Sequence, residues 1–209
     1  MIKNISDLKN KMKIDSKVFE GDELFIKGYA IFRPGISEVQ FNHLNEILPE
    51  LPESYTECLK RYNVLGVTVG YFSLSPISWD SDSIVDSLIK AQSVEESFLP
   101  RAILDPLDLY WIGYNEGNTI YVAGKNSPSY LEGEIVVIFE YNLDAEGKIC
   151  ENYRLPLAKD FEQFLVIAGN LNEVHRLNAE PEISKIEMLQ RLNTLNVDEK
   201  YHEFWLAYL

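Results

Sequence analysis

The pattern that most restricts the fold lies in residues 109–141, where three apolar segments of strand length follow one another closely. Residues 109–114 (LYWIGY) and 119–123 (TIYVA) are joined by Asn-Glu-Gly-Asn, a composition typical of tight turns. The third segment, 134–141 (EIVVIFEY), follows a glycine. Parallel neighbours would need helices between consecutive strands, and this stretch has no room for them. The sequence therefore predicts antiparallel pairing.

Helical periodicity flanks this strand-rich region on both sides. The order of helices, strands and helices predicts an α+β fold. We expect a single domain with a mainly antiparallel sheet, or alternatively a mixed sheet, flanked by helices and followed by a helical C-terminal extension. The chain has 209 residues, which suffices for one such domain. The expected helices cover 37–48, 52–62, 160–177, 182–195 and 199–208.

Apolar spacing predicts which side chains are buried. The spacing in the helix 37–48 indicates one apolar face, and a three-residue repeat in 182–195 indicates a stripe that needs a partner surface, on this chain or on a second copy. Residues 67–74 are expected to form a strand, and Trp111 is expected in the core. The two helical sets are Val39, Phe41, Leu44, Ile47 and Leu48, and Ile183, Ile186, Leu189 and Leu192.

The motifs of common active sites do not occur. The chain has neither of the usual glycine-rich phosphate loops, no H-E-x-x-H and no G-x-S-x-G. Its histidines lie far apart on predicted helices, and its 33 acidic residues make coincidental carboxylate pairs inevitable. The acids at 80, 82 and 86 lack the glycine and the closing glutamate of a calcium loop, because Ala91 stands at the closing position. We therefore expect no enzyme, no catalytic residues, no metal and no cofactor.

The two cysteines, Cys58 and Cys150, form no metal-ligand or redox motif. Both are expected to be small buried apolar residues, a usage that fits a reducing compartment. The N-terminal residues show no signal peptide, and no apolar run is long enough to cross a bilayer. The expected location is the cytoplasm.

The net charge of −14 is concentrated in the middle of the chain, where residues 51–160 carry 17 acids and 8 bases. Such a charge repels nucleic acids and anionic membranes and attracts cationic partners. Many cytosolic proteins are acidic for solubility alone, so charge by itself leaves both interpretations open.

The acidic residues between positions 79 and 108 form the candidate partner-binding surface. They outnumber the two bases Lys90 and Arg101, and a tryptophan beside them could serve as an apolar anchor within a charged rim. The alternative is a solvated acidic face. The candidate residues are Trp79, Asp80, Asp82, Asp86, Glu95, Glu96, Asp105 and Asp108.

Four segments together resemble the SUKH superfamily of Smi/Knr-type proteins. Residues 51–63 (LPESYTECLKRYN) are similar to its L-P-x-x-[YF] helix, and 111–122 (WIGYNEGNTIYV) to its I-G-x-x-x-G-[DN] hairpin. Residues 133–138 (GEIVVI) resemble the following strand, and 161–165 (FEQFL) the closing helix. The resemblance covers residues 36–178. It departs at Asn118, where many members have aspartate, and it leaves 1–35 as an N-terminal extension and 179–209 as a C-terminal helical extension.

The resemblance implies a function. Most bacterial members of this superfamily are thought to be immunity proteins that bind and neutralise a polymorphic toxin, and they offer no catalytic residues to carry over. Many such toxin domains are basic nucleases, for which an acidic inhibitor is electrostatically suited. The expected partner is therefore a basic cognate toxin, with no nucleic acid and no membrane, and a homodimer remains an option. The alternatives are a regulator or scaffold of the same fold and an unrecognised hydrolase.

Overall fold

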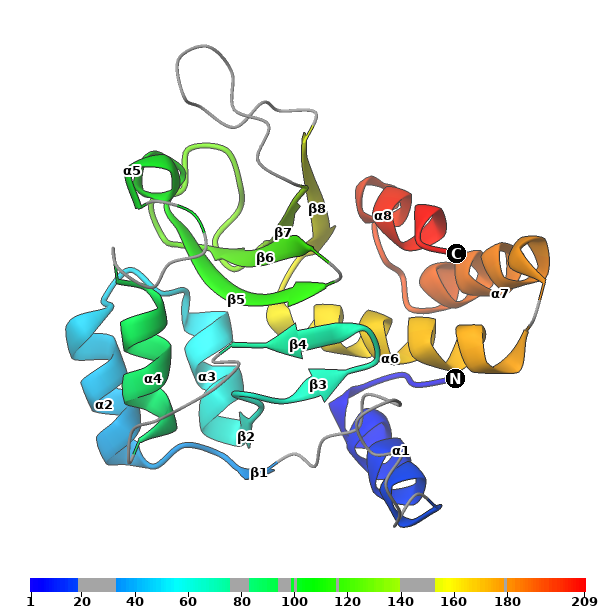
Figure 1. Ribbon diagram of the computed structural model, residues 1–209, viewed down its shortest axis with the longest axis horizontal. Helices are drawn as coiled ribbons and strands as arrows, with labels where there is room; N and C mark the ends of the chain where they lie inside the picture. Colours follow the sequence, from blue (N-terminus) through cyan, green and yellow to red (C-terminus); the bar gives the residue numbers. More distant parts are fainter. Residues whose placement is uncertain are drawn as a thin grey trace.

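The computed structural model describes residues 1–18, 33–75, 83–93, 99, 101–115, 117–139, 153–178 and 180–209. Within these residues an open antiparallel sheet of six strands, in the order β3-β4-β5-β6-β7-β8, packs against helices to form a single α+β domain (Figure 1). The predicted class and the antiparallel pairing are confirmed, and the described strands show no mixed sheet. The strands are Thr68–Val69 (β3), Phe72–Leu74 (β4), Leu109–Asn115 (β5), Asn118–Ala123 (β6), Ile135–Ile138 (β7) and Arg154–Ala158 (β8).

A separate two-stranded sheet pairs β1 (Arg33–Pro34) with β2 (Tyr62–Asn63). The five helices with predicted ranges agree with them to within a few residues, whereas the short helix at 101–104 stands where the sequence pattern indicated strands. Their starts follow local chemistry: Ser37 forms a capping box with Gln40, and Asp160 accepts from the backbone N–H of Gln163. The helices are Ile5–Val18 (α1), Glu38–Ile47 (α2), Glu53–Arg61 (α3), Ile84–Ala91 (α4), Arg101–Leu104 (α5), Phe161–Leu177 (α6), Pro181–Thr194 (α7) and His202–Ala207 (α8), with 3-10 turns at Asp105–Leu107 (η1) and Glu199–Tyr201 (η3).

The segment 67–74, predicted as one strand, is a tight hairpin of β3 and β4. Gly70 has a φ of +60°, a left-handed conformation that glycine adopts without steric cost, so the chain reverses there. Thr68 then pairs with Ser73, and Val69 with Phe72. The reversal turns one expected strand into two short ones.

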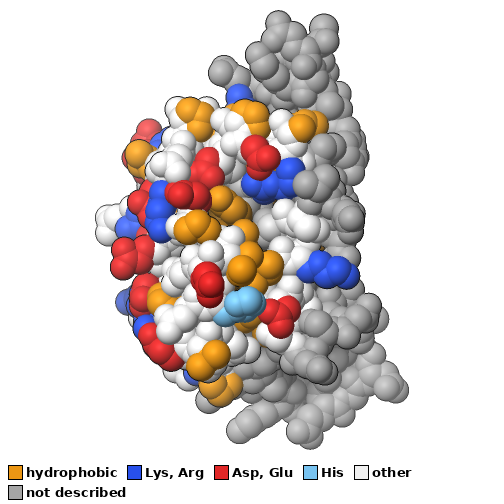
Figure 2. Space-filling model, turned by 90° about the vertical axis from the view of Figure 1, so that its left-hand side faces the viewer, with side chains coloured by type: hydrophobic (Ala, Val, Ile, Leu, Met, Phe, Trp, Pro, Cys, Tyr) orange, Lys and Arg blue, Asp and Glu red, His pale blue; other side chains and the backbone are white. Residues whose placement is uncertain are grey.

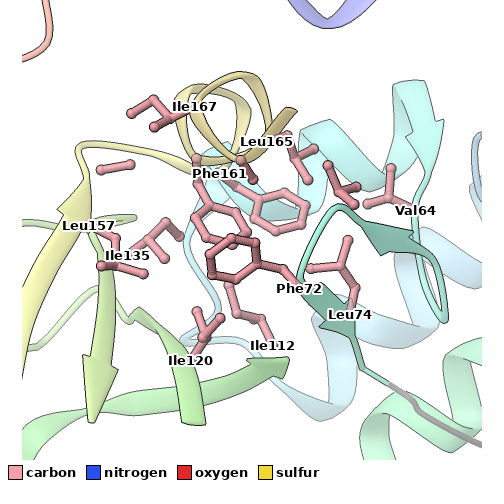
Figure 3. Close-up of a cluster of buried hydrophobic side chains, with 14 of the residues drawn as sticks. Val64, Phe72, Leu74, Ile112, Ile120, Ile135, Leu157, Phe161, Leu165 and Ile167 are labelled. Atoms are coloured by element: carbon pink, nitrogen blue, oxygen red, sulfur yellow. The ribbon is translucent and has the colours of Figure 1, made fainter. Parts of the chain in front are cut away.

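The sheet has a hydrophobic cluster on each face. The larger cluster lies between the sheet and α6, where Phe72, Phe161 and Leu165 meet side chains from β5 to β8 (Figure 3). The smaller one contains Trp111 and Tyr121 and is covered by α5 and neighbouring loops. Trp111 is buried, as predicted. Alternate residues of each strand point to opposite faces, which explains why both clusters draw on the same strands.

Both segments outside the SUKH-like range contribute to the larger cluster. Leu8 of α1 and Met188 of α7 are buried in it, and Trp205 of α8 is fully buried and donates a hydrogen bond from Nε1 to the Leu157 carbonyl oxygen (2.8 Å). The terminal helices therefore pack on the domain. The family-based boundaries at 35/36 and 178/179 stay predictions.

The predicted apolar stripe on α7 does not form one face. Leu192 is buried, but Ile183, Ile186 and Leu189 are exposed. Three residues of α-helix rotate by about 300°, so each step drifts by about 60° and Leu192 lies on the opposite side of the helix from Ile183. A three-residue repeat over four positions thus spirals around the helix.

None of the described helices is long and apolar enough to cross a lipid bilayer.

Candidate protein-interaction face

Three of the predicted partner-binding residues fall within the described part of the chain, and they have different environments. Asp86 and Asp105 are exposed, with 51% and 60% of their side-chain surface accessible. Asp108 is turned toward the molecule. The remaining candidates, Trp79, Asp80, Asp82, Glu95 and Glu96, lie outside the described residues.

Asp108 holds a turn. Its φ of +48° is left-handed, and its Oδ2 accepts a hydrogen bond from the backbone N–H of Asn126 (2.7 Å). Gly124 fits against the same carboxylate, since a Cβ added there would lie 2.4 Å from Oδ2. Burial raises the pKa of the Tyr110 hydroxyl, and the nearby Asp108 carboxylate raises it further by a smaller amount. Asp108 therefore links the start of β5 to the loop after β6, and its carboxylate is engaged within the molecule.

Asp105 stays accessible although it forms an ion pair with Arg101. The guanidinium of Arg101 is largely buried, because it also donates to the carbonyl oxygen of Leu109 (3.1 Å) and lies over the Tyr110 ring. Arg101 thus neutralises part of the Asp105 charge while presenting little positive charge of its own.

Asp86 joins α4 to α2. Its backbone N–H is capped by Ser83, and its carboxylate contacts the Nε2 atom of His43 at 3.1 Å. On α2, Val39 is 78% exposed and Ile47 is 48% exposed, and His43 lies between them on the same stripe at four-residue spacing. The helix α2 fully buries Leu44 alone. The apolar face predicted for α2 is therefore wrong at Val39 and Ile47.

We call Val39, His43, Ile47 and Asp86, with the flanking acids Glu38 and Glu46, the α2–α4 face. The helix α2 carries these two acids and no lysine or arginine. Figure 2 views this side of the molecule and shows hydrophobic side chains among acidic and basic ones, with a histidine between them. Lys60 of α3 pairs with Glu38 (3.1 Å), so the negative charge of the face comes mainly from Glu46 and Asp86, beside the exposed apolar groups.

The groups that could support chemistry are dispersed. His43 contacts Asp86, His175 Nδ1 contacts the Tyr71 hydroxyl (3.1 Å), and His202 Nε2 contacts the Val197 carbonyl oxygen (3.0 Å). In the ranges given above, no three His, Cys, Asp or Glu side chains gather as a metal site requires. These three histidines serve three separate local contacts.

Cys58 is fully buried, as expected, and burial raises the pKa of its thiol to about 12. The thiol therefore stays protonated at neutral pH and is a poor nucleophile. Cys150 lies outside the described residues.

Comparison with known proteins yields no relative: no family model, curated protein or solved structure matches the chain. The segments that resemble the SUKH superfamily nevertheless have definite structural roles. Gly113 lies at the irregularity of β5, where a Cβ would come within 2.6 Å of the Ser73 carbonyl oxygen. Gly133 has a φ of +81° and packs against Ser54 of α3. Membership in that superfamily stays a prediction.

Proposed function

We propose that this chain is an immunity protein that acts in the cytoplasm by binding and neutralising a cognate toxin with a basic surface. The observation that carries the proposal is the α2–α4 face, where Val39 and Ile47 stand exposed on a helix whose charged side chains are acidic. The resemblance to the SUKH superfamily supports the toxin as the partner.

The two features of the face have separate physical roles. Its carboxylates, together with the net charge of −14, attract a cationic partner over long range and raise the association rate. The apolar side chains supply the burial that holds the complex once formed. A basic protein with an apolar site within its charged surface meets both requirements.

The experiment measures binding of the purified protein product of the gene beside the one that encodes this chain. The site variant is Glu46→Lys with Asp86→Lys, and the control is Glu199→Lys with Glu203→Lys, which changes the net charge equally on exposed residues far from α2. We expect the site variant to slow association roughly tenfold at low salt and to flatten its salt dependence, and the control to have a much smaller effect.

Two results would contradict the proposal at different levels. Equal association rates for the site variant and the control would remove the α2–α4 face from the interface. Failure of the wild-type chain to bind the neighbouring gene product, or to relieve its toxicity in co-expression, would argue against the immunity function. Binding without relief of toxicity would favour a regulator or scaffold.

A further inference from the structure

The histidine at the centre of the α2–α4 face has one ring nitrogen engaged and one left over. Its Nε2 atom lies 3.1 Å from Oδ1 of Asp86, and the side chain of His43 is 46% exposed. The ring makes no other hydrogen bond with the residues that the structure describes. One nitrogen of His43 is therefore tied to α4, and Nδ1 is left for a group outside the chain.

The contact with Asp86 decides which nitrogen carries the proton of the neutral ring. An ionised carboxylate only accepts hydrogen bonds, so Nε2 of His43 is the donor at this contact. A neutral imidazole has a single N–H, which makes Nδ1 an acceptor. Asp86 is itself held in place, because its backbone N–H donates to the Ser83 hydroxyl (3.3 Å). The ring therefore offers a hydrogen-bond acceptor in the middle of the face.

The charged groups around His43 favour a cation as the donor. Lys60 of α3 is paired with Glu38 (3.1 Å), so these two charges offset each other. Lys90 lies one turn beyond the ring's carboxylate partner on α4. Glu46, three residues after His43 on the same helix, adds a second carboxylate beside the ring. A lysine or arginine that donates to Nδ1 therefore also meets negative charge.

Two apolar side chains determine the state of the ring once the face is covered. Val39 and Ile47 are each four residues from His43, one on either side of it along α2. A partner that covers them also removes the ring from water, which disfavours the charged imidazolium. A partner cation at Nδ1 disfavours the imidazolium further by like-charge repulsion. Burial and charge thus both select the neutral ring in a complex.

We propose that His43 determines the specificity of the α2–α4 face by accepting a hydrogen bond at Nδ1 from a lysine or arginine of the toxin. This role rests on the proposed function, since the toxin supplies the donor. Imidazole changes its charge between pH 5 and 8, and an imidazolium ring has no acceptor. The complex therefore binds fewer protons than the free chain, and its affinity falls as the pH falls through that range. Asp86 is a positioning residue, because it holds the proton on the other nitrogen.

Nitrogen NMR of the free chain at pH 8 tests the state of the ring. The signals of His43 should show the proton of the neutral ring on Nε2, and Asp86→Ala should let the form with the proton on Nδ1 appear. This measurement needs no toxin, so it stands independently of the proposed function. A wild-type ring with its proton mainly on Nδ1 would overturn the proposal.

The second experiment measures affinity for the neighbouring gene product from pH 5 to pH 8. Wild type should bind at least roughly tenfold more weakly at pH 5 than at pH 8. His43→Asn places an amide oxygen near the Nδ1 position, whereas His43→Gln reaches toward Asp86 and leaves the partner's donor unpaired. Neither amide titrates, so both variants should lose the pH dependence that belongs to the ring. At pH 8 the Gln variant should bind roughly tenfold more weakly than the Asn variant.

The control is His175→Gln on α6, which should keep the full pH dependence. Titration of the toxin's own groups is common to all variants, so differences between them isolate His43. Equal affinities of His43→Asn and His43→Gln at pH 8, or an unchanged pH dependence in both, would overturn the role of His43. The proposed function would survive either result if Glu46→Lys with Asp86→Lys still slowed association. A wild-type chain that binds the neighbouring gene product at no pH would overturn both.

Discussion

Helices α6 and α2 both carry apolar residues at helical spacing, yet they have opposite roles in the structure. Helix α6 buries ten of its residues, among them Phe161 and Phe164, whereas α2 fully buries Leu44 alone. The sequence pattern predicted a helix for each and one buried apolar face for α2. The difference shows that apolar spacing identifies a helix more securely than it identifies how much of that helix is covered.

The cause is the number of neighbours around each helix. Helix α6 packs between the sheet and the helices α1, α3 and α7, so it has partners on several sides (Figure 1). Gly169 illustrates this crowding, since a Cβ there would lie 2.6 Å from Cδ1 of Leu8 in α1. Helix α2 makes its main contacts with α3 and α4 and leaves its outer side open. The open side of α2 is therefore accessible to a partner protein, whereas the enclosed helix α6 contributes mainly to the stability of the fold.

Truncation of a core ring on α6 should destabilise the fold most. Phe164→Ala removes a fully buried ring that packs against Phe72 and Trp205, at centroid distances of 5.3 and 6.0 Å. It should lower the free energy of unfolding by about 3–5 kcal/mol, as truncation of a core phenylalanine does. Phe41→Ala on α2, the same change at a partly exposed ring, should cost less than about 2 kcal/mol. Similar losses in urea denaturation would mean that α2 is enclosed as well.

The next effect concerns the ionic contact between α6 and α7. Arg191 is 9% exposed in its side chain, and Arg191→Gln leaves the carboxylate of Glu173 without its guanidinium. We expect a loss of about 3 kcal/mol, near the lower limit for breaking a buried pair, because Glu173 keeps some contact with water and its ion pairs with the Met1 amine (3.7 Å) and Lys11 (3.8 Å). Lys60→Gln, which breaks the exposed pair with Glu38 between α3 and α2, should cost no more than about 1 kcal/mol. A larger loss for Lys60→Gln than for Arg191→Gln in chemical denaturation would contradict this expectation.

A smaller effect depends on pH. Hydrogen bonds from Asn178 and then Arg191 lower the pKa of Glu187 in the folded chain. The charged carboxylate therefore contributes stability above its unfolded pKa, and this contribution disappears as the pH falls through the lowered native pKa. Glu187→Gln should cost about 1 kcal/mol at neutral pH, the size of one hydrogen-bonded contact. The gap between wild type and variant should close well below about pH 4. A constant gap from pH 7 to pH 3 in thermal melts would show that the charge is not the source.

Truncation of an exposed side chain on α2 should change the stability of the fold least. Ile47→Ser removes an apolar side chain that is 48% exposed on α2, and it should change the free energy of unfolding by no more than about 0.5 kcal/mol. The same variant should weaken toxin binding if the α2–α4 face is the interface. A stability loss above about 1.5 kcal/mol would instead assign Ile47 to the core.

Part of the candidate site could be predicted from the sequence. Asp86 and Asp105 are exposed, as their place in an acidic cluster indicated, but Asp108 is engaged by the turn that its left-handed φ creates. Val39 and Ile47 were missed as surface residues. The exposure of Val39 could have been inferred from helix geometry. Val39 lies about 140° around the helix from the buried Leu44, so the two side chains cannot share one narrow face.

Local sequence specifies the individual helices and hairpins, because their causes lie within a few residues of one another. Turn composition specified the β5–β6 hairpin, and the caps Ser37 and Asp160 specified the starts of α2 and α6. Which apolar side chains are covered follows from the packing of the whole domain and not from local sequence. Burial depends on neighbours far along the chain. Leu8 is covered because α1 packs against α6, whereas Ile186 faces outward although the other side of α7 packs against α6.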